Sequence, residues 1–299
     1  MKLLVTGLSG FVGSHCADIA PHAVDLAVDG RRADLRDAAQ VQAAIDAIRP
    51  DAVLHLAGQS FVPTAIEEPQ LTGQVNVEGT RHLLQALSAS GFGGRMLYVG
   101  SADAYGVVPE SKLPVTEAQP LAPLNPYAQS KADAENLCRD WAGRAAFEIV
   151  IARPFNHIGP RQGTRFAVSS FARQVAAYSA GRGSGKLVAG NLDTTRDFTD
   201  VRDVVAAYMA LLHSGRNGEA YNVCSGVERS MRELVLAMME AAGVEMEIVT
   251  DESLLRPTEQ LRMWGSFDKL RADTGWSPAI PLRTTLKDTF DYWLQEDGR

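Results

Sequence analysis

The chain has 299 residues, of which 45% are hydrophobic and 22% are charged, and its formal net charge is −7. This composition is typical of a soluble globular protein with a buried core, and the acidic balance argues against a general nucleic-acid-binding protein. No apolar run approaches the roughly 18 residues of a membrane span. The three cysteines form no metal or disulfide motif, and MKLLVTG runs directly into a glycine turn, so we expect no metal, no signal peptide and a cytoplasmic location.

Apolar runs alternate with helical segments along the first half of the chain. Buried strands are predicted at residues 2–6, 22–28, 52–56, 95–99 and 147–152. Helices are predicted between them, at residues 11–20, 38–48, 71–90 and 126–143. Strands that alternate with helices predict an α/β fold of the Rossmann type, a doubly wound parallel sheet with helices on both faces.

The second half of the chain is less regular. It has helical segments at 203–213, 231–242 and 282–294, short strands at 220–223 and 247–249, and loops at 160–165 and 181–186. We expect a first domain over residues 1–157, to which a segment at about 195–225 returns. A smaller mixed α/β domain is expected over residues 158–194 and 226–299.

The turn after the first predicted strand contains three glycines. Gly7 permits a tight turn, Gly10 lets backbone amides approach a pyrophosphate, and Gly13 lets the helix pack close to the strand. Phe11 and Val12 begin the helix, whose free N–H groups favour an anion. The spacing is GxxGxxG, and its place between a strand and a helix predicts dinucleotide binding.

Residues 29–32 read Asp-Gly-Arg-Arg, at about 20 residues beyond the turn. An acid at this distance holds the ribose 2′-hydroxyl of NAD, whereas an arginine suits the 2′-phosphate of NADP. The adjacent guanidiniums favour a dianionic phosphate. We therefore expect NADP(H) as the preferred cofactor, with Arg32 at the phosphate and NAD(H) as the alternative.

A tyrosine and a lysine stand four residues apart at the start of the helix at 126–143. Tyr127 and Lys131 therefore lie on one face of that helix, and the lysine charge is expected to lower the tyrosine pKa. Ser101 follows the fourth predicted strand, at the sheet edge where ligands bind. Tyr127 is predicted to exchange a proton with a carbonyl or alcohol oxygen of the substrate, and Ser101 to donate a hydrogen bond to the same oxygen.

These motifs resemble the extended short-chain dehydrogenases/reductases, and the resemblance spans the chain in the family's order. It implies a catalytic set of Ser101, Tyr127 and Lys131, of which Tyr127 and Lys131 also contact the cofactor, together with Pro154. Asp34 and Leu35 are expected near the adenine, and Leu56, Ala57 and Gly58 along the cofactor. The resemblance also implies a homodimer joined through a four-helix bundle made by residues 71–90 and 126–143.

Two arginine motifs in the second half are similar to the segments with which sugar-nucleotide members hold a diphosphate. They are Arg196-Asp197-Phe198 and Arg256-Pro257-Thr258-Glu259. Guanidinium forks match phosphate oxygens bidentately. The resemblance further places Asp103, Asn156 and Glu259 at the substrate. His55 is interpreted as a core histidine whose hydrogen bonds are satisfied, and His157 as a structural hydrogen-bonding residue. Asn76 is interpreted as a residue that holds the backbone near the active site.

Within the family, the strings around residues 55–63, 152–160 and 221–226 most resemble reductases that convert GDP-4-keto-6-deoxy-D-mannose to GDP-D-rhamnose. A reductase that forms GDP-6-deoxy-D-talose, a GDP-mannose 4,6-dehydratase and a 4-epimerase are the enzyme alternatives. Dehydratases carry a glutamate after a polar residue where this chain has Asp103 after Ala102, which favours simple reduction. A non-enzymatic dinucleotide-binding redox sensor is disfavoured because Ser101, Tyr127 and Lys131 are all present.

Overall fold

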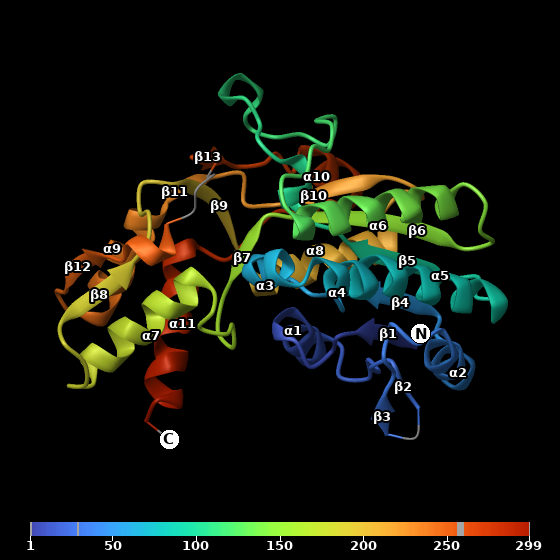
Figure 1. Ribbon diagram of the computed structural model, residues 1–299, viewed down its shortest axis with the longest axis horizontal. Helices are drawn as coiled ribbons and strands as arrows, with labels where there is room; N and C mark the ends of the chain where they lie inside the picture. The colour runs from blue at the N-terminus through green and yellow to red at the C-terminus, as the bar shows by residue number, and fades with distance from the viewer. Residues whose placement is uncertain (1, 29, 256–259, 299) are drawn as a thin grey trace.

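A computed structural model describes residues 2–28, 30–255 and 260–298. Two lobes are visible in Figure 1. The right-hand lobe holds the large sheet and both its helical layers, and the left-hand lobe contains β8, β12 and the helices α7, α9 and α11.

The large sheet has five parallel strands in the order β1-β4-β5-β6-β10. Their bounds are β1 Leu3–Thr6, β4 Ala52–His55, β5 Arg95–Val99, β6 Glu148–Pro154 and β10 Ala220–Val223. Strand residues are almost all buried, as expected when helices cover both faces of a parallel sheet. The predicted fold class is therefore confirmed.

Alternate residues of each strand pack against opposite helical layers. Leu4, Val53 and Met96 face a core shared with α2 (Ala38–Ile48), α5 (Gly79–Ala89) and α6 (Pro126–Ala142). Val5, Leu54 and Leu97 face a second core shared with α1 (Phe11–Ile19) and α8 (Val201–Ser214). Because all five strands are parallel, their carboxyl ends, and the loops that follow them, lie along one edge of the lobe.

Two predicted elements of the first half differ from the structure. The strand expected at 22–28 is reduced to a single bridge of Val24 with Leu4, followed by a hairpin of β2 (Ala27–Val28) and β3 (Arg31–Arg32). The helix expected at 71–90 begins as α4 (Pro69–Gly73) and passes through a π-helical turn, Gln74–Glu78, into α5.

The left-hand lobe has its own apolar core between α7, α9 and α11. The elements of the chain not yet bounded are α3 Val62–Glu67, β7 Asn156–Ile158, α7 Ala167–Ser179, β8 Lys186–Ala189, β9 Thr195–Asp200, β11 Glu228–Ser230, α9 Met231–Ala242, β12 Glu247–Thr250, β13 Arg262–Met263, α10 Asp268–Thr274 and α11 Leu282–Glu296, with short 3-10 turns at Ala102–Tyr105, Glu110–Lys112 and Glu252–Leu254. Strand β9 pairs with β7, β11 and β13 and so runs between the lobes.

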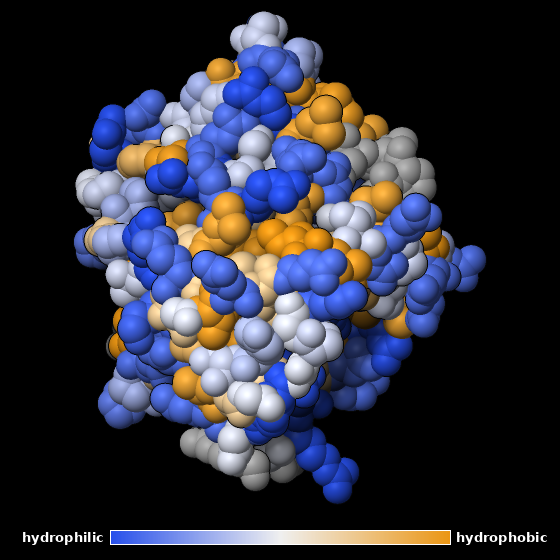
Figure 2. All heavy atoms as spheres, turned by 90° about the vertical axis from the view of Figure 1, so that its left-hand side faces the viewer, coloured by the Kyte–Doolittle hydropathy of each residue, from blue (hydrophilic) through white to orange (hydrophobic). Residues whose placement is uncertain are grey.

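The outer face of the left-hand lobe carries apolar side chains near its middle, ringed by polar ones (Figure 2). Within residues 2–28, 30–255 and 260–298, none of the helices combines the length and apolarity that crossing a bilayer requires.

Candidate active site

The glycine turn has the geometry expected for a dinucleotide. Gly7 adopts a φ of +79°, and a β-carbon on Gly13 would lie 2.2 Å from the Gly7 carbonyl oxygen. Gly10 is the N-cap of α1 and offers no side-chain cap to the helix. Phe11 and Val12 form its first turn and are partly exposed. The free amides and the helix dipole therefore fit a pyrophosphate, and each glycine is required by close backbone packing or by the turn itself.

Arg32 lies beside this turn. Its guanidinium donates to the Ser9 hydroxyl at 2.6 Å and to the Asp25 carboxylate at 2.9 Å, and its side chain is exposed. The Asp25 carboxylate also accepts from the Gly7 amide at 3.2 Å. A cation held at the rim of the glycine turn matches the predicted site of a 2′-phosphate.

Other residues predicted to bind the cofactor lie at the ends of neighbouring strands. Ala57 donates its amide to Thr6 at 3.1 Å, and it follows Leu56, the first residue after β4. A β-carbon on Gly58 would lie 2.9 Å from the Asn76 amide oxygen and 3.6 Å from Lys131 Nζ. Gly58 therefore lies where the loop after β4 approaches the predicted catalytic lysine.

Asp34 and Leu35 lie between the hairpin of β2 and β3 and helix α2. Arg36 forms an ion pair with Asp34 at 2.6 Å, and this hydrogen bond lowers the pKa of the carboxyl. Leu35 is buried, and its carbonyl oxygen bonds His82 Nδ1 at 2.8 Å. Pro154 is the last residue of β6, where it pairs with Val223 of β10.

The structure brings the three predicted catalytic residues together. Ser101 is the second residue after the end of β5, and its hydroxyl hydrogen-bonds the Tyr127 side chain. Tyr127 and Lys131 lie in the first turns of α6, which Asn125 caps by accepting from the Ala128 amide at 2.9 Å. All three side chains are buried. The arrangement places a phenol and an alcohol where both can contact one substrate oxygen.

The expected effect of Lys131 on Tyr127 is wrong for this structure. Burial raises the pKa of Tyr127 above its usual value of 10, the charge of Asp103 raises it further, and the Ser101 hydrogen bond opposes both. The Lys131 ammonium instead donates to the Val99 carbonyl at 2.8 Å and lies 5.5 Å from the centre of the Tyr98 ring. Burial lowers the pKa of Lys131 to about 8. Desolvation of the phenol therefore sets the direction of the shift in the Tyr127 pKa.

Three residues interpreted as structural are satisfied by hydrogen bonds. His55 contacts Thr6 at 2.7 Å and Thr80 at 3.0 Å, and burial lowers its pKa to about 3. His157 Nδ1 bonds the Phe155 carbonyl at 3.1 Å. Asn76 accepts from the Gln59 amide at 2.8 Å and donates to Ser130 at 2.9 Å. The π-helical turn therefore ties the loop after β4 to α6.

The predicted substrate residues follow the strand ends toward the second lobe. Asp103 is exposed on the 3-10 turn after Ser101, and its amide donates to the Ser101 hydroxyl at 3.2 Å. Asn156 donates to the Asp197 carbonyl at 3.2 Å. Arg196 donates to the Leu261 carbonyl at 3.2 Å. Strand β9 brings Asn156 and Arg196 onto adjacent strands, whereas Arg256 and Glu259 lie outside the described residues.

One buried residue escaped the sequence analysis. Glu135 pairs with Arg153, at 2.5 Å between Nη2 and Oε1, and both side chains are almost fully buried. Its sequence signal is its spacing, because Glu135 follows Lys131 by one helical turn and therefore lies on the same helix face.

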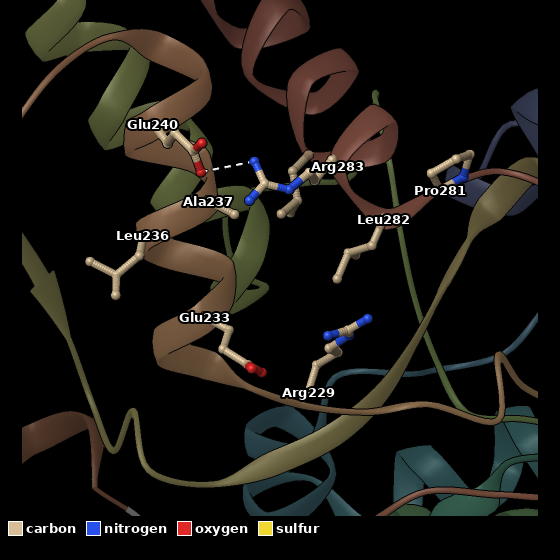
Figure 3. Close-up of a pocket in the computed structure, with 9 residues that line it drawn as sticks. Arg229, Glu233, Leu236, Ala237, Glu240, Pro281, Leu282 and Arg283 are labelled. Atoms are coloured by element: carbon tan, nitrogen blue, oxygen red, sulfur yellow. Dashed lines mark hydrogen bonds and ion pairs between the residues drawn. The ribbon is translucent and has the colours of Figure 1, made fainter.

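A separate groove of about 550 Å³ lies between α9 and the start of α11. Figure 3 shows Leu236 and Leu282 at this groove, with Arg283 paired to Glu240 at 2.8 Å. None of its lining residues belongs to the predicted site. Within the described part of the chain, no group of histidine, cysteine or acidic side chains could hold a metal ion.

Comparisons with known proteins agree with this geometry. A family described as GDP-mannose 4,6 dehydratase matches residues 19–289. GDP-6-deoxy-D-mannose reductase of Pseudomonas aeruginosa is 44% identical over 304 residues, which cover 98% of this chain and 97% of the relative. GDP-6-deoxy-D-talose 4-dehydrogenase of Aggregatibacter actinomycetemcomitans is 30% identical over 277 residues, 90% of each chain.

A solved structure of RMD from Pseudomonas aeruginosa complexed with NADPH has a TM-score of 0.92 and 42% identity, and the match covers 99% of this chain and 100% of that one. One family accounts for the glycine turn, for the Ser101–Tyr127–Lys131 cluster and for the match over most of the chain. The chain belongs to the GDP-mannose 4,6-dehydratase family, within the extended short-chain dehydrogenases/reductases.

Proposed function

We propose that this protein uses NADPH to reduce the 4-keto group of GDP-4-keto-6-deoxy-D-mannose, which forms GDP-D-rhamnose. The observation that carries the proposal is the hydrogen-bonded pair of Ser101 and Tyr127 at the carboxyl edge of the sheet, in a chain 44% identical to a GDP-6-deoxy-D-mannose reductase. The cofactor assignment is supported by the fit of the glycine turn and Arg32, and by the NADPH complex of the similar RMD structure.

NADPH, when bound, supplies the hydride that C4 receives. The Tyr127 phenol gives its proton to the C4 oxygen, and the Ser101 hydroxyl donates a hydrogen bond to the same oxygen. The raised pKa of Tyr127 keeps the phenol protonated at neutral pH, as a proton donor requires. Carbonyl, hydride and proton together give the secondary alcohol, and solvent then returns a proton to Tyr127.

The substrate contacts are proposed along the path from β5 to β9. Asp103 contacts ring hydroxyls, since its carboxylate stands near enough to Tyr127 to raise the pKa of the phenol. Asn156 and Arg196 meet the sugar and the diphosphate, and Arg256 and Glu259 contribute from the adjoining segment. A guanidinium fork at Arg196 would bind two phosphate oxygens.

The deciding experiment supplies NADPH and GDP-4-keto-6-deoxy-D-mannose and identifies the product by NMR. GDP-D-rhamnose is expected, whereas GDP-6-deoxy-D-talose would mean that the hydride reaches the other ring face. Conversion of GDP-mannose to the keto sugar would make the protein a dehydratase, and interconversion of two 4-epimers an epimerase. Tight NADPH binding with no turnover of any keto sugar nucleotide would indicate a sensor.

The wider organisation is proposed from the resemblance. The cofactor domain comprises residues 1–157 and about 195–225, and the sugar-nucleotide domain comprises 158–194 and 226–299. A homodimer forms through the helices at 71–90 and 126–143, which light scattering after size exclusion tests. All three cysteines are free and buried, which supports a reducing compartment, the cytoplasm.

A further inference from the structure

A buried ion pair connects the catalytic helix to the sheet. The Arg153 guanidinium of β6 donates to Glu135 of α6, at 2.9 Å from Nε and 2.5 Å from Nη2. The exposed fractions of the two side chains are 4% and 1%. Such a pair is weak evidence for stability, because removing two charges from water costs about as much as their attraction returns. The role of the Glu135–Arg153 pair is therefore inferred from the elements that it connects.

The same guanidinium continues to the turn after β5. Arg153 Nη1 donates to the Tyr105 hydroxyl at 2.8 Å, and its guanidinium carbon lies 4.9 Å from the centre of the Tyr105 ring. The Tyr105 hydroxyl in turn donates to Asn222 of β10 at 2.7 Å. Tyr105 and Asn222 are completely buried. Every polar atom of this Tyr105 link is therefore satisfied inside the lobe.

The two ends of the network belong to the two elements that carry the proton donor pair. Glu135 lies two helical turns beyond Tyr127 on α6. Tyr105 ends the 3-10 turn that begins immediately after Ser101. A displacement of one element relative to the other would change the contact between the Ser101 hydroxyl and the Tyr127 phenol, and a misplacement of about 1 Å can cost about 100-fold in rate.

We propose that Glu135, Arg153 and Tyr105 are positioning residues, which hold Ser101 and Tyr127 in the geometry that proton transfer requires. The inference rests on the proposed reductase function. It assigns no contact with substrate to these residues, because each acts through the element it fixes.

The test compares Tyr105→Phe with Arg139→Gln. The first variant keeps the Glu135–Arg153 pair but removes the hydroxyl that links it to the Ser101 turn. The second removes the two bonds of 3.1 Å that Arg139 donates to the same Glu135 carboxylate, and Arg139 reaches the Gly218 carbonyl and not the Ser101 turn. Glu135→Gln is the second test, since it keeps the side-chain volume while removing the charge.

We expect Tyr105→Phe to lower kcat about tenfold, with unchanged NADPH Kd and sugar-nucleotide KM, while Arg139→Gln keeps the wild-type kcat. Glu135→Gln should show the same fall in kcat, with circular dichroism confirming the fold. Wild-type kcat per folded Tyr105→Phe molecule, with only a lower Tm, would overturn the proposal. So would a raised KM with unchanged kcat, since Tyr105 would then serve substrate binding.

Hydrogen exchange separates this proposal from the proposed reaction. In Tyr105→Phe, amides of residues 101–106 are expected to exchange faster than in the wild type or in Arg139→Gln. Unchanged exchange there would contradict the positioning role whatever the substrate is. A wild-type protein that fails to reduce the keto sugar would instead refute the proposed function, and the exchange result would still stand on its own.

Discussion

Lys131 carries a charged ammonium group that is buried in the folded protein, and the burial of this charge destabilises the folded state. Its pKa falls from 10.5 to about 8. Below pH 8, this shift lowers the free energy of unfolding by about 3 kcal/mol. Between pH 8 and 10.5 the unfolded chain holds the extra proton, so the stability of the wild type rises with pH over this interval.

Lys131→Met should therefore be more stable than the wild type at pH 7, by up to about 3 kcal/mol, and should lose nearly all reductase activity. Urea unfolding at pH 7 and pH 10 measures the difference. The gain should shrink at pH 10, where the wild-type lysine is neutral in the folded protein. An equal gain at both pH values would mean that packing, and not charge, explains the stabilisation.

Arg32 provides a second test at this scale, for cofactor preference. Arg32→Ala should raise the Kd for NADPH at least about tenfold and leave the Kd for NADH nearly unchanged, because only NADPH has the 2′-phosphate. Arg31→Ala is the matched control on the same short strand, β3. Fluorescence titration with both cofactors measures the four constants. Equal weakening of NADPH and NADH would remove Arg32 from the phosphate site.

Helix α6 starts one residue before the predicted proton donor, and its cap therefore bears on catalysis. Asn125→Ala removes the bond to the Ala128 amide and should cost about 1 kcal/mol of stability. We expect kcat to fall as well, since fraying of the first turn displaces Tyr127.

Asp37→Ala is the matched control for this cap. Asp37 accepts from two amides of α2, at 3.0 and 3.1 Å, and α2 carries none of the predicted catalytic residues. Asp37→Ala should lower Tm by about as much as Asn125→Ala does, and it should leave kcat unchanged. A similar loss of kcat in both variants would assign the effect to global stability.

Sequence patterns predicted most elements because they are local. The bounds of α2, β5, β10 and α9 agree with the expected ones, and each is a continuous apolar or periodic run. The strand expected at 22–28 was too long, since only Val24 reaches β1 before the chain turns at Gly30. Helix α7 was not predicted, because no capping side chain marks its start.

In the candidate site too, local sequence patterns predicted some features and only the folded chain shows the others. The spacing of Tyr127 and Lys131 sufficed to place them on one helix face. The direction of the Tyr127 pKa depends on burial by distant segments, which no local pattern contains. The Glu135–Arg153 pair joins different elements 18 residues apart, so only the folded chain shows it.

At the scale of the whole molecule, the two lobes meet beside α1. The Phe11 ring stacks on His157, with ring centres 6.0 Å apart and planes at 4°. Arg161, whose backbone φ is +72°, donates to His15 Nδ1 at 2.6 Å and pairs with Asp18. These contacts join the helix of the glycine turn to the segment that enters the second lobe.

Arg161→Gln should loosen this junction. We expect a higher KM for the sugar nucleotide, because the substrate is proposed to contact both lobes, and a stability loss of about 1 kcal/mol. Arg173→Gln is the control, since Arg173 pairs at 3.1 Å with Asp297 inside the second lobe. Steady-state kinetics and thermal unfolding measure both variants. An unchanged KM in Arg161→Gln would show that substrate binding does not depend on this junction.

The place of β10 beside β6 has a consequence for biosynthesis. The ribosome completes β6 at residue 154 but reaches β10 only at residues 220–223, so the nascent sheet keeps an unpaired border while the intervening segment is translated. Unpaired strand borders bind other chains readily. Translation that pauses between these two strands should therefore expose the chain to aggregation, whereas a pause after β10 has emerged should not.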